Sequence, residues 1–362
     1  MLFRSVIPFI SKRVEFQDLT PEQLPHPHWL NVYADGPHLH EYLQEMHREV
    51  LSRYDTMTVG EAIGVTEAQV PLFVDEERRE LDMIFNFDAV RIDRDTWRKT
   101  AWTLPALKAI YTRLDRAVGP RGWTTVFLGN HDNPRAVSHF GDDRPEFRVT
   151  SAKALATMML TQRGTPFIYQ GEELGMTNFP FERLDQFDDV EVKGQWQDYV
   201  ESGQVTGAEF LRHMRDTSRD HSRTPMQWTA ARHAGFTLAE KPWLAVHPDF
   251  ATINAEAALA DENSIYRHYQ RLLRLRRQLP ALLYGDYFDL DPLHERLFVF
   301  SRTLGSERLL TAVNFGGEEQ HLRLPEGIAA RELLLGNLPS RTGLTHATEL
   351  ELAPWEALLL RI

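Results

Sequence analysis

Apolar residues in the first half of the chain fall into stripes at helical spacing. The first stripe predicts an amphipathic helix, because its members recur at intervals of three and four residues. They are Leu43, Met46, Val50, Leu51 and Tyr54. A second stripe predicts a helix over residues 107–118. A third begins at Thr150 and Ser151, which we expect to cap the helix, and Gly164 is expected to end it.

Short apolar runs lie between these stripes and predict strands. They cover residues 56–59, 83–87, 124–128 and 167–169. Strands that alternate with helices at this spacing imply a parallel sheet with helical crossovers. Four strands are too few to close an eight-stranded barrel. We therefore expect an α/β fold that contains only part of such a barrel.

The second half of the chain has a different texture. Residues 179–261 are irregular and rich in Asp, Arg and Trp, which indicates long loops and short helices. Residues 263–279 predict one more amphipathic helix. Short alternating runs separated by Gly and Pro turns then indicate antiparallel strands. We place the domain boundary so that residues 1–282 form the α/β domain and residues 283–362 form a C-terminal antiparallel β-sandwich.

Composition narrows the class of protein. The formal net charge of -12 argues against a nucleic-acid partner, because a phosphate-binding surface needs a basic excess. No apolar run is long enough to cross a membrane, and the first twelve residues lack a signal-peptide cleavage site. The absence of cysteine excludes disulfides and thiolate metal sites and is typical of a cytoplasmic protein. The 10% aromatic content suits a neutral ring-shaped ligand such as a sugar.

Polar side chains follow three of the predicted strands. Glu61 follows the first, His131 and Asp132 follow the third, and a Gln-Gly-Glu-Glu run at 170–173 follows the fourth. The carboxyl ends of barrel strands form one open face, where catalysis usually occurs. Taken singly, each carboxylate is more often a helix cap or a solvated loop charge than a functional group. His131 alone is equally explained as a structural histidine. Three such groups on the same predicted face favour a functional site.

Four motifs stand in order along the chain. They are Thr58-Val59-Gly60-Glu61, Asn130-His131-Asp132-Asn133-Pro134-Arg135, the run Gly-Thr-Pro-Phe-Ile-Tyr-Gln-Gly-Glu-Glu at 164–173, and Ser222-Arg223-Thr224-Pro225-Met226-Gln227-Trp228. Together they resemble the α-amylase superfamily, glycoside hydrolase family thirteen, in its oligo-1,6-glucosidase, isomaltulose hydrolase and sucrose isomerase group. The resemblance runs from about residue 6 to residue 362. It implies about the second half of a (β/α)8 TIM barrel, followed by the β-sandwich domain.

The resemblance assigns roles to several residues. Retaining glycosidases use two carboxyl groups about 5–5.5 Å apart, one as acid/base and one as nucleophile. Glu61 matches the acid/base, and Asp132 matches a third catalytic carboxylate that holds sugar hydroxyls. His131 matches a histidine that bonds the same hydroxyls, and Arg223 matches an arginine at the site entrance. Arg135 either orients the carboxylate network or forms a salt bridge under the loop.

Two further positions indicate the subgroup. Residues 91–95, Arg-Ile-Asp-Arg-Asp, are similar to an Arg-Leu-Asp-Arg-Asp stretch of sucrose isomerases that influences the product, which makes Arg91 a substrate-binding candidate. Phe87 matches one of two phenylalanines that retain fructose in those enzymes, although simple barrel packing also explains it. Ile63 stands at the second position. Because an aromatic face is lost there, we favour a hydrolase of isomaltulose- or isomaltose-like sugars over a sucrose isomerase.

The nucleophile position departs from the family pattern. The family has Gly-Phe-Arg-Met-Asp-Val-Ile, and alignment on Val6-Ile7 puts Ser5 where the aspartate belongs. A serine without a neighbouring base cannot replace a carboxylate nucleophile. We therefore expect the chain alone to be inactive and interpret it as a truncated or frameshifted reading frame, or as half of a split enzyme whose partner is an N-terminal half-barrel polypeptide. Release of glucose from isomaltulose by the purified chain tests this expectation.

A different class of function stays open at this point. Amylase-like proteins that have lost catalytic carboxylates serve as non-catalytic binding or scaffold subunits. Glu61, His131, Asp132 and Arg223 favour the enzyme lineage, because a scaffold has no physical need for this cluster of sugar-binding groups. We expect no cofactor and no metal, since the calcium loop of relatives has no counterpart here. The sequence does not fix the preferred disaccharide or the oligomeric state.

Overall fold

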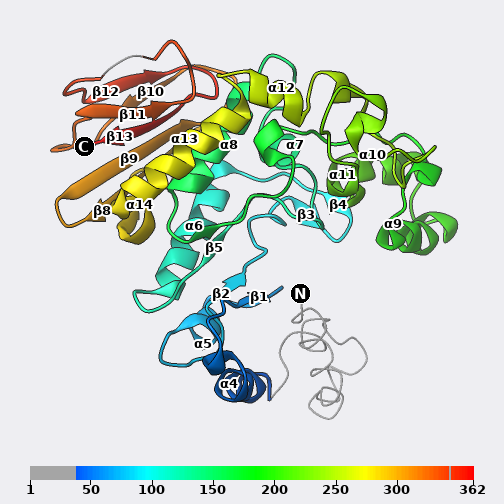
Figure 1. Ribbon diagram of the computed structural model, residues 1–362, viewed down its shortest axis with the longest axis horizontal. Coiled ribbons are helices and arrows are strands. Elements are labelled where there is room, and N and C mark those ends of the chain that lie inside the picture. Colours follow the sequence, from blue (N-terminus) through cyan, green and yellow to red (C-terminus); the bar gives the residue numbers. More distant parts are fainter. Residues whose placement is uncertain (1–37, 342–343) are drawn as a thin grey trace. The chain divides into compact units, whose positions relative to one another are not determined.

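The computed structural model describes residues 38–341 and 344–362, and Ser5 lies outside the described residues. The chain divides into two compact units (Figure 1). Of the described residues, the first unit comprises 38–91 and 109–126, and the second comprises 92–108, 127–341 and 344–362. The predicted boundary between residues 282 and 283 falls inside the second unit and stays a prediction.

The first unit contains a parallel strand pair with helices beside it. Strand β1 (Val59–Glu61) pairs in parallel with β2 (Met83–Phe85), as the sequence predicted. The Thr125 hydroxyl of β5 (Thr125–Val126) donates to the carbonyl of Ile84 at 2.9 Å. The helices are α4 (Leu39–Glu49), η1 (Leu51–Arg53), α5 (Val70–Val74) and the part of α6 (Leu104–Val118) from residue 109 onward.

Strand β1 begins later than predicted, and a side chain explains the difference. The predicted strand covered residues 56–59, but β1 starts at Val59. The backbone N–H and the hydroxyl of Thr58 both donate to a carboxylate oxygen of Asp82, at 2.6 and 2.7 Å. The backbone before Val59 is therefore bound to a side chain instead of a neighbouring strand.

The second unit begins with a hairpin and a long buried helix. Strands β3 (Arg94–Asp95) and β4 (Arg98–Lys99) pair antiparallel. Helix α7 (Ala136–Phe140) leads to α8 (Arg148–Thr161), and β6 (Thr165–Pro166) is followed by the short helix η2 (Glu172–Leu174). The predicted strand at 167–169 is wrong, because the pairing residues are 165–166. The Tyr169 hydroxyl instead donates to the carbonyl of Ser222 at 2.9 Å.

The predicted ends of α8 are also wrong. Its N-cap is Phe147, which makes no side-chain cap. Thr150 and Ser151 lie inside the first turn, where their hydroxyls donate to the carbonyls of Phe147 (3.0 Å) and Asp142 (2.9 Å). The helix ends at Thr161, before Gly164, because the carbonyls beyond it are taken by a guanidinium. That group belongs to Arg276, which donates to the carbonyls of Leu160 (2.7 Å), Gln162 (2.8 Å) and Gly164.

Residues 179–261 form loops and short helices, as predicted. The elements are η3 (Leu184–Gln186), α9 (Val190–Gln195), the π-helical turn η4 (Trp196–Glu201), α10 (Gly207–Thr217), α11 (Asp220–Arg223), η5 (Arg232–Gly235), η6 (Pro248–Ala251) and α12 (Ala255–Ala260). An aromatic cluster fixes several of them, because Phe181 and Phe210 are fully buried beside Trp97. The predicted helix at 263–279 is α13 (Ile265–Gln278), capped by the Ser264 hydroxyl, and α14 (Pro280–Tyr284) follows it.

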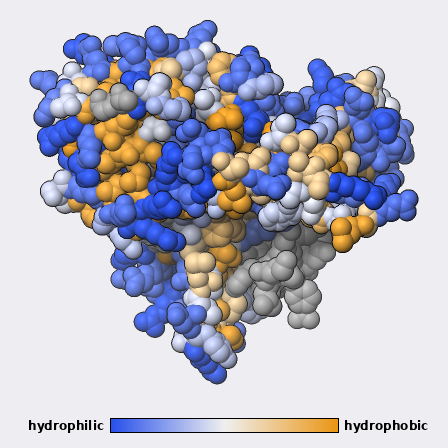
Figure 2. All heavy atoms as spheres, turned by 45° about the horizontal axis from the view of Figure 1, so that its top comes forward, coloured by the Kyte–Doolittle hydropathy of each residue, from blue (hydrophilic) through white to orange (hydrophobic). Residues whose placement is uncertain are grey.

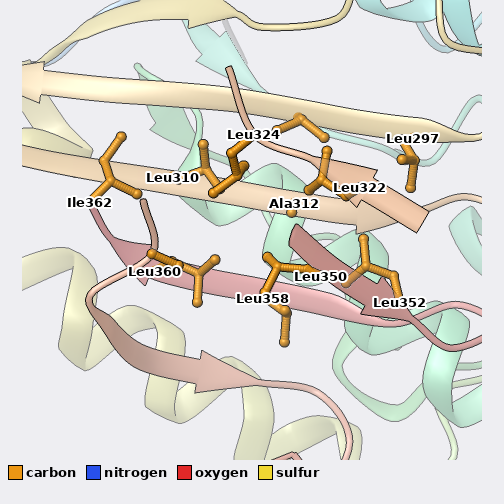
Figure 3. Packing of buried hydrophobic residues seen from close by; sticks show 12 residues of the cluster. Leu297, Leu310, Ala312, Leu322, Leu324, Leu350, Leu352, Leu358, Leu360 and Ile362 are labelled. Carbon is orange, nitrogen blue, oxygen red and sulfur yellow. The ribbon is translucent and has the colours of Figure 1, made fainter. Parts of the chain in front are cut away.

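The C-terminal part is an antiparallel sheet faced by a smaller strand pair. The larger sheet has the order β11-β13-β9-β8-β7, and β10 pairs antiparallel with β12. The strands are β7 (Asp286–Asp289), β8 (Leu297–Leu304), β9 (Glu307–Asn314), β10 (Gln320–Arg323), β11 (Glu332–Gly336), β12 (Glu349–Leu352) and β13 (Ala357–Arg361). Leucines of the two sheets form a shared core (Figure 3). Helix α8 packs against β9 and β13, and α13 packs against α8 (Figure 1).

This leucine core gives a stability prediction. Replacing Leu358, which is fully buried on β13, with Ala leaves a cavity and should cost about 3 kcal/mol in the free energy of unfolding. Leu304→Ala on β8 is the control, because Leu304 is 40% exposed, and should cost well under about 1 kcal/mol. Urea unfolding of both variants measures the difference. Equal losses for the two would contradict the assigned core.

The surface is mixed in polarity. Figure 2 shows apolar residues gathered in patches within a mainly hydrophilic face. Large exposed apolar side chains of the second unit include Trp228, Leu238 and Trp243. Among the helices in the described ranges, none is both long enough and apolar enough to span a membrane.

Candidate functional site

Glu61 is the last residue of β1 and is partly buried. Gly60 precedes it, and Leu81 packs closely there: a Cβ at this position would lie 2.7 Å from the Cδ1 of Leu81, so that side chain would have to shift. The Ala62 N–H donates to the carbonyl of Phe85 at 3.3 Å, so the backbone stays paired with β2 directly after Glu61. The tip of β1 is thus held on both sides of the carboxylate.

Phe87 and Arg91 lie in the turn that follows β2. Phe87 is 6% exposed, and its carbonyl accepts the backbone N–H of Arg91 at 3.1 Å. The Arg91 side chain is exposed. In the second unit, the next part of the Arg-Ile-Asp-Arg-Asp stretch is anchored by a buried pair, in which Nε2 of His139 lies 2.9 Å from a carboxylate oxygen of Asp93.

The loop that carries His131 and Asp132 is folded around an asparagine side chain. The Oδ1 atom of Asn130 accepts the backbone N–H of Asp132 at 2.8 Å and the side-chain amide of Asn133 at 2.7 Å. The Ser222 hydroxyl donates to the Asn133 carbonyl at 2.6 Å and ties this loop to α11. The loop leaves the His131 side chain 49% exposed and the Asp132 side chain 16% exposed.

Arg223 joins the two residues of this loop. Its Nη2 donates to Oδ1 of Asp132 at 2.7 Å, and its Nε donates to the carbonyl of His131 at 2.9 Å. The Nε2 atom of His131 lies 3.4 Å from Oδ2 of Asp132. The structure therefore brings together three of the residues that the sequence nominated. Bonds to both the side chain of Asp132 and the backbone beside it fix the orientation of that carboxylate.

The sequence did not point to three further charged residues of this cluster, Arg219, Asp189 and Glu191. Nη1 of Arg219 lies 3.6 Å from Oδ1 of Asp132, while Nε donates to the buried carboxylate of Asp189 at 2.7 Å. A carboxylate oxygen of Glu191 lies 3.0 Å from the same Nε. One feature of the sequence could have identified Arg219: it lies four residues before Arg223, so a helix places both guanidiniums within one turn.

Charge pairing sets the ionisation of this network. Burial by itself would raise the pKa of Asp189, but the hydrogen bonds from Arg219 and the Glu191 backbone outweigh it, so the pKa is lowered. The pKa of Arg219 is raised, first by its hydrogen bond to Asp189. The network therefore stays charged at neutral pH and holds a fixed positive edge beside Asp132.

The same pair predicts a pH-dependent loss of stability. Because the folded-state pKa of Asp189 is depressed, its contribution is present above the unfolded value near 3.8 and is lost as pH falls through the folded value. Arg219→Met should cost about 2–4 kcal/mol at pH 7, since it removes both hydrogen bonds of the guanidinium to the buried carboxylate of Asp189. That carboxylate keeps Arg223, at 3.7 Å, and the Glu191 N–H beside it. Urea unfolding at pH 7 and pH 3 should show a smaller difference between variant and parent at pH 3. A difference that is constant or grows toward acid would be contrary to this pairing.

Arg135 is placed differently from its neighbours. It is 2% exposed and donates to the carbonyls of His221 (3.0 Å) and Gln170 (2.7 Å) and to the hydroxyl of Thr224 (3.3 Å). Burial lowers its pKa to about 10, against the opposing effect of Tyr169 and two nearby glutamates. The guanidinium thus joins the segment after β6 to α11 through backbone carbonyls and a hydroxyl. The sequence had suggested contacts with carboxylates instead.

Histidine and carboxylate groups elsewhere do not add a metal centre. Across residues 38–341 and 344–362, no group of three or more His, Cys, Asp or Glu side chains is arranged to hold a metal ion.

The comparison with protein families identifies the class to which the chain belongs. Residues 3–285 match the family described as alpha amylase, catalytic domain, so the chain belongs to this family. Its fold is the α-amylase family fold, with helices followed by a C-terminal antiparallel sheet.

Particular relatives narrow the group. The chain is 40% identical over 366 residues to the oligo-1,6-glucosidase of Parageobacillus thermoglucosidasius, which covers 99% of this chain and 64% of the relative. It is also similar to the isomaltulose synthase of Klebsiella sp. LX3, with a TM-score of 0.91, 50% identity, and coverage of 95% of this chain and 62% of the other. A trehalulose synthase structure gives the same TM-score at 48% identity and the same two coverages. The chain thus spans less than two thirds of the length of these relatives.

Proposed function

We propose that this chain carries the acid/base and the glycone-binding arm of a retaining α-glucosidase that acts on short α-glucosides of the isomaltose or isomaltulose type. The observation that supports this most is the contact of Arg223 with both Asp132 and His131. A carboxylate held by guanidiniums beside a half-exposed imidazole offers an acceptor and a donor to adjacent sugar hydroxyls. Family membership and the position of Glu61 at the tip of β1 complete the assignment.

The roles follow from the chemistry of a retaining mechanism. Glu61 protonates the glycosidic oxygen as the bond breaks and then takes a proton from the water that attacks the glycosyl-enzyme. Asp132 binds hydroxyls of the glucose ring most strongly when the ring distorts toward the transition state. Arg223 fixes the carboxylate of Asp132 in advance, so little reorganisation accompanies that step.

The nucleophile calls for a second proposal. Ser5 stands at its position, and a hydroxyl without a neighbouring base does not form the glycosyl ester that a carboxylate forms. We infer that activity depends on a carboxylate at this position and on an N-terminal half-barrel polypeptide. In this view β1, β2, β5 and β6 belong to part of a (β/α)8 barrel whose other strands come from that partner.

Hydrolysis and isomerisation are the two candidate outcomes of the reaction. Ile63 at the second aromatic position supports hydrolysis, because an aliphatic side chain retains the leaving sugar less well than an aromatic ring. The higher identity to the synthases, 48–50% against 40% for the glucosidase, favours a sucrose isomerase as the second candidate. Products from sucrose separate them: glucose and fructose for a hydrolase, isomaltulose or trehalulose for an isomerase.

A chimaera tests the proposal directly. The part of the Klebsiella synthase that matches this chain would be replaced by residues 1–362, with either Ser5 or Ser5→Asp at the nucleophile position. The Ser5→Asp chimaera should release glucose from isomaltose, and the Ser5 chimaera should be slower by at least about 10³-fold. Equal turnover by the two chimaeras would refute the nucleophile assignment, and no turnover by either would count against the proposed function.

A further inference from the structure

A buried carboxyl group lies beneath the loop that carries His131 and Asp132. Glu172 is 7% exposed, and neither of its carboxyl oxygens has a hydrogen-bond partner among the described residues. A Cβ added at Gly129 would lie 2.7 Å from Oε1 of Glu172. The carboxyl therefore packs against the backbone at Gly129, which directly precedes the sequence Asn130-His131-Asp132.

The turn that holds Glu172 is tightly packed. It runs between Gly171 and Gly175, whose φ angles of 93° and 65° are left-handed. A Cβ at Gly171 would lie 2.5 Å from Sδ of Met176, so the turn is closely packed as well. The backbone N–H of Gly171 donates to the carboxylate of Glu173 at 2.9 Å. Glu172 is thus fixed facing Gly129.

The surroundings of Glu172 favour the neutral form of its carboxyl group. Burial raises the pKa of Glu172 to about 8 and Glu173 in the same turn raises it further, while the backbone at Tyr169 and the charge of Arg135 oppose the shift. Arg148 of α8 donates to the carbonyls of Leu174 and Gly175 in this turn. Tyr269 of α13 has a raised pKa, caused first by burial and then by the two glutamates.

We propose that Glu172 is a positioning residue for the sugar-binding loop: its neutral carboxyl packs against Gly129 and fixes the backbone that presents His131 and Asp132. Ionisation of this group would bury an unpaired negative charge against that backbone, and the loop would loosen to hydrate it. This inference rests on the proposed function only for the role of Asp132 in sugar binding. It predicts that loop order, and with it sugar binding, has an alkaline limit that Glu172 sets.

Hydrogen exchange of the 362-residue chain tests this idea. In the parent, amides of a peptide covering residues 127–135 should lose about tenfold of their protection between pH 6 and pH 9, after correction for the chemical pH dependence of exchange. Glu172→Gln keeps a neutral side chain of the same shape and should retain protection at both pH values. Glu201→Gln, at an exposed position in η4, should behave like the parent.

Two outcomes would overturn the proposal. One is equal protection of this peptide at pH 6 and pH 9 in the parent, and the other is the same alkaline loss in Glu172→Gln. Gly129→Ala provides a second variant with Glu172 intact, and it should loosen the loop at both pH values because its Cβ displaces the carboxyl. The exchange measurement needs no sugar. Failure of the proposed function would instead be seen as unchanged turnover of the Asp132→Asn variant of the Ser5→Asp chimaera, so the two failures are distinguishable.

Discussion

Replacing Asp132 with Asn in the Ser5→Asp chimaera is expected to lower turnover of isomaltose by about 10³-fold. The substitution keeps the shape of the side chain but removes the negative charge that faces Arg223 at 2.7 Å and Arg219 at 3.6 Å. An amide would offer an N–H₂ group toward one of these guanidiniums or would rotate and lose the sugar hydroxyls. The loss should fall mainly on kcat, because the carboxylate binds the distorted ring more strongly than the relaxed one.

Asp185→Asn is the matched control for this prediction. Asp185 lies on η3, its side chain is 72% exposed, and it pairs with Arg183 at the surface. It should leave both kcat and KM within about twofold of the parent chimaera, as is usual for an exposed ion pair. If Asp132→Asn retained most of the turnover, Asp132 would have a structural role, and the sugar-binding assignment of this loop would be wrong.

Replacing Arg302 with Met is expected to destabilise the second unit by about 3–5 kcal/mol. Arg302 is fully buried in β8, and its guanidinium donates to the carbonyls of Thr161 (2.9 Å), Leu282 (2.9 Å) and Gly285 (2.8 Å). These carbonyls come from the end of α8, from α14 and from the residue that follows α14. Methionine fills part of the volume but removes the guanidinium donor from the carbonyls of Thr161 and Gly285, while Leu282 keeps Arg276 at 3.2 Å.

Urea unfolding of this variant measures the cost, with Arg323→Met as control. The Arg323 side chain on β10 is 82% exposed, so its loss should change stability by less than about 0.5 kcal/mol. A shift for Arg302→Met that is as small as that of the control would show that the three carbonyls find other partners. The connection between α8 and the C-terminal sheet would then rest on apolar packing alone.

Periodic features of the sequence predicted much of the fold. The amphipathic stripes at 107–118 and 263–279 became α6 and α13, because one-sided burial at helical spacing is a local property of the sequence. The parallel pairing of β1 and β2 followed from the alternation of strands and helices. The strand predicted at 167–169 lies at 165–166 instead, and the Tyr169 hydroxyl that follows it bonds to the carbonyl of Ser222, fifty-three positions away. Such a contact leaves no trace in a local pattern.

Only part of the candidate site was predicted, because motifs are local and many contacts of the site join residues that are remote in sequence. Asp132, His131 and Arg223 were found through motifs, and the structure brings them into contact. Arg219 was not singled out, since its contacts are with Asp132 and Asp189, which are remote in sequence. Glu172 was named only as part of the polar run 170–173 that follows the fourth predicted strand. Burial is the largest cause of the raised pKa of Glu172, and burial is not visible in a short run of residues.

The role of Glu61 as acid/base is the central claim, and one comparison tests it most directly. In the Ser5→Asp chimaera, Glu61→Gln should lower isomaltose turnover by about 10³-fold, because the alcohol leaving group needs a proton. The same variant should still form the glycosyl-enzyme rapidly from 2,4-dinitrophenyl α-glucoside, whose leaving group needs none, and should show a burst followed by slow hydrolysis. Equal losses on both substrates, or no loss on isomaltose, would contradict the account.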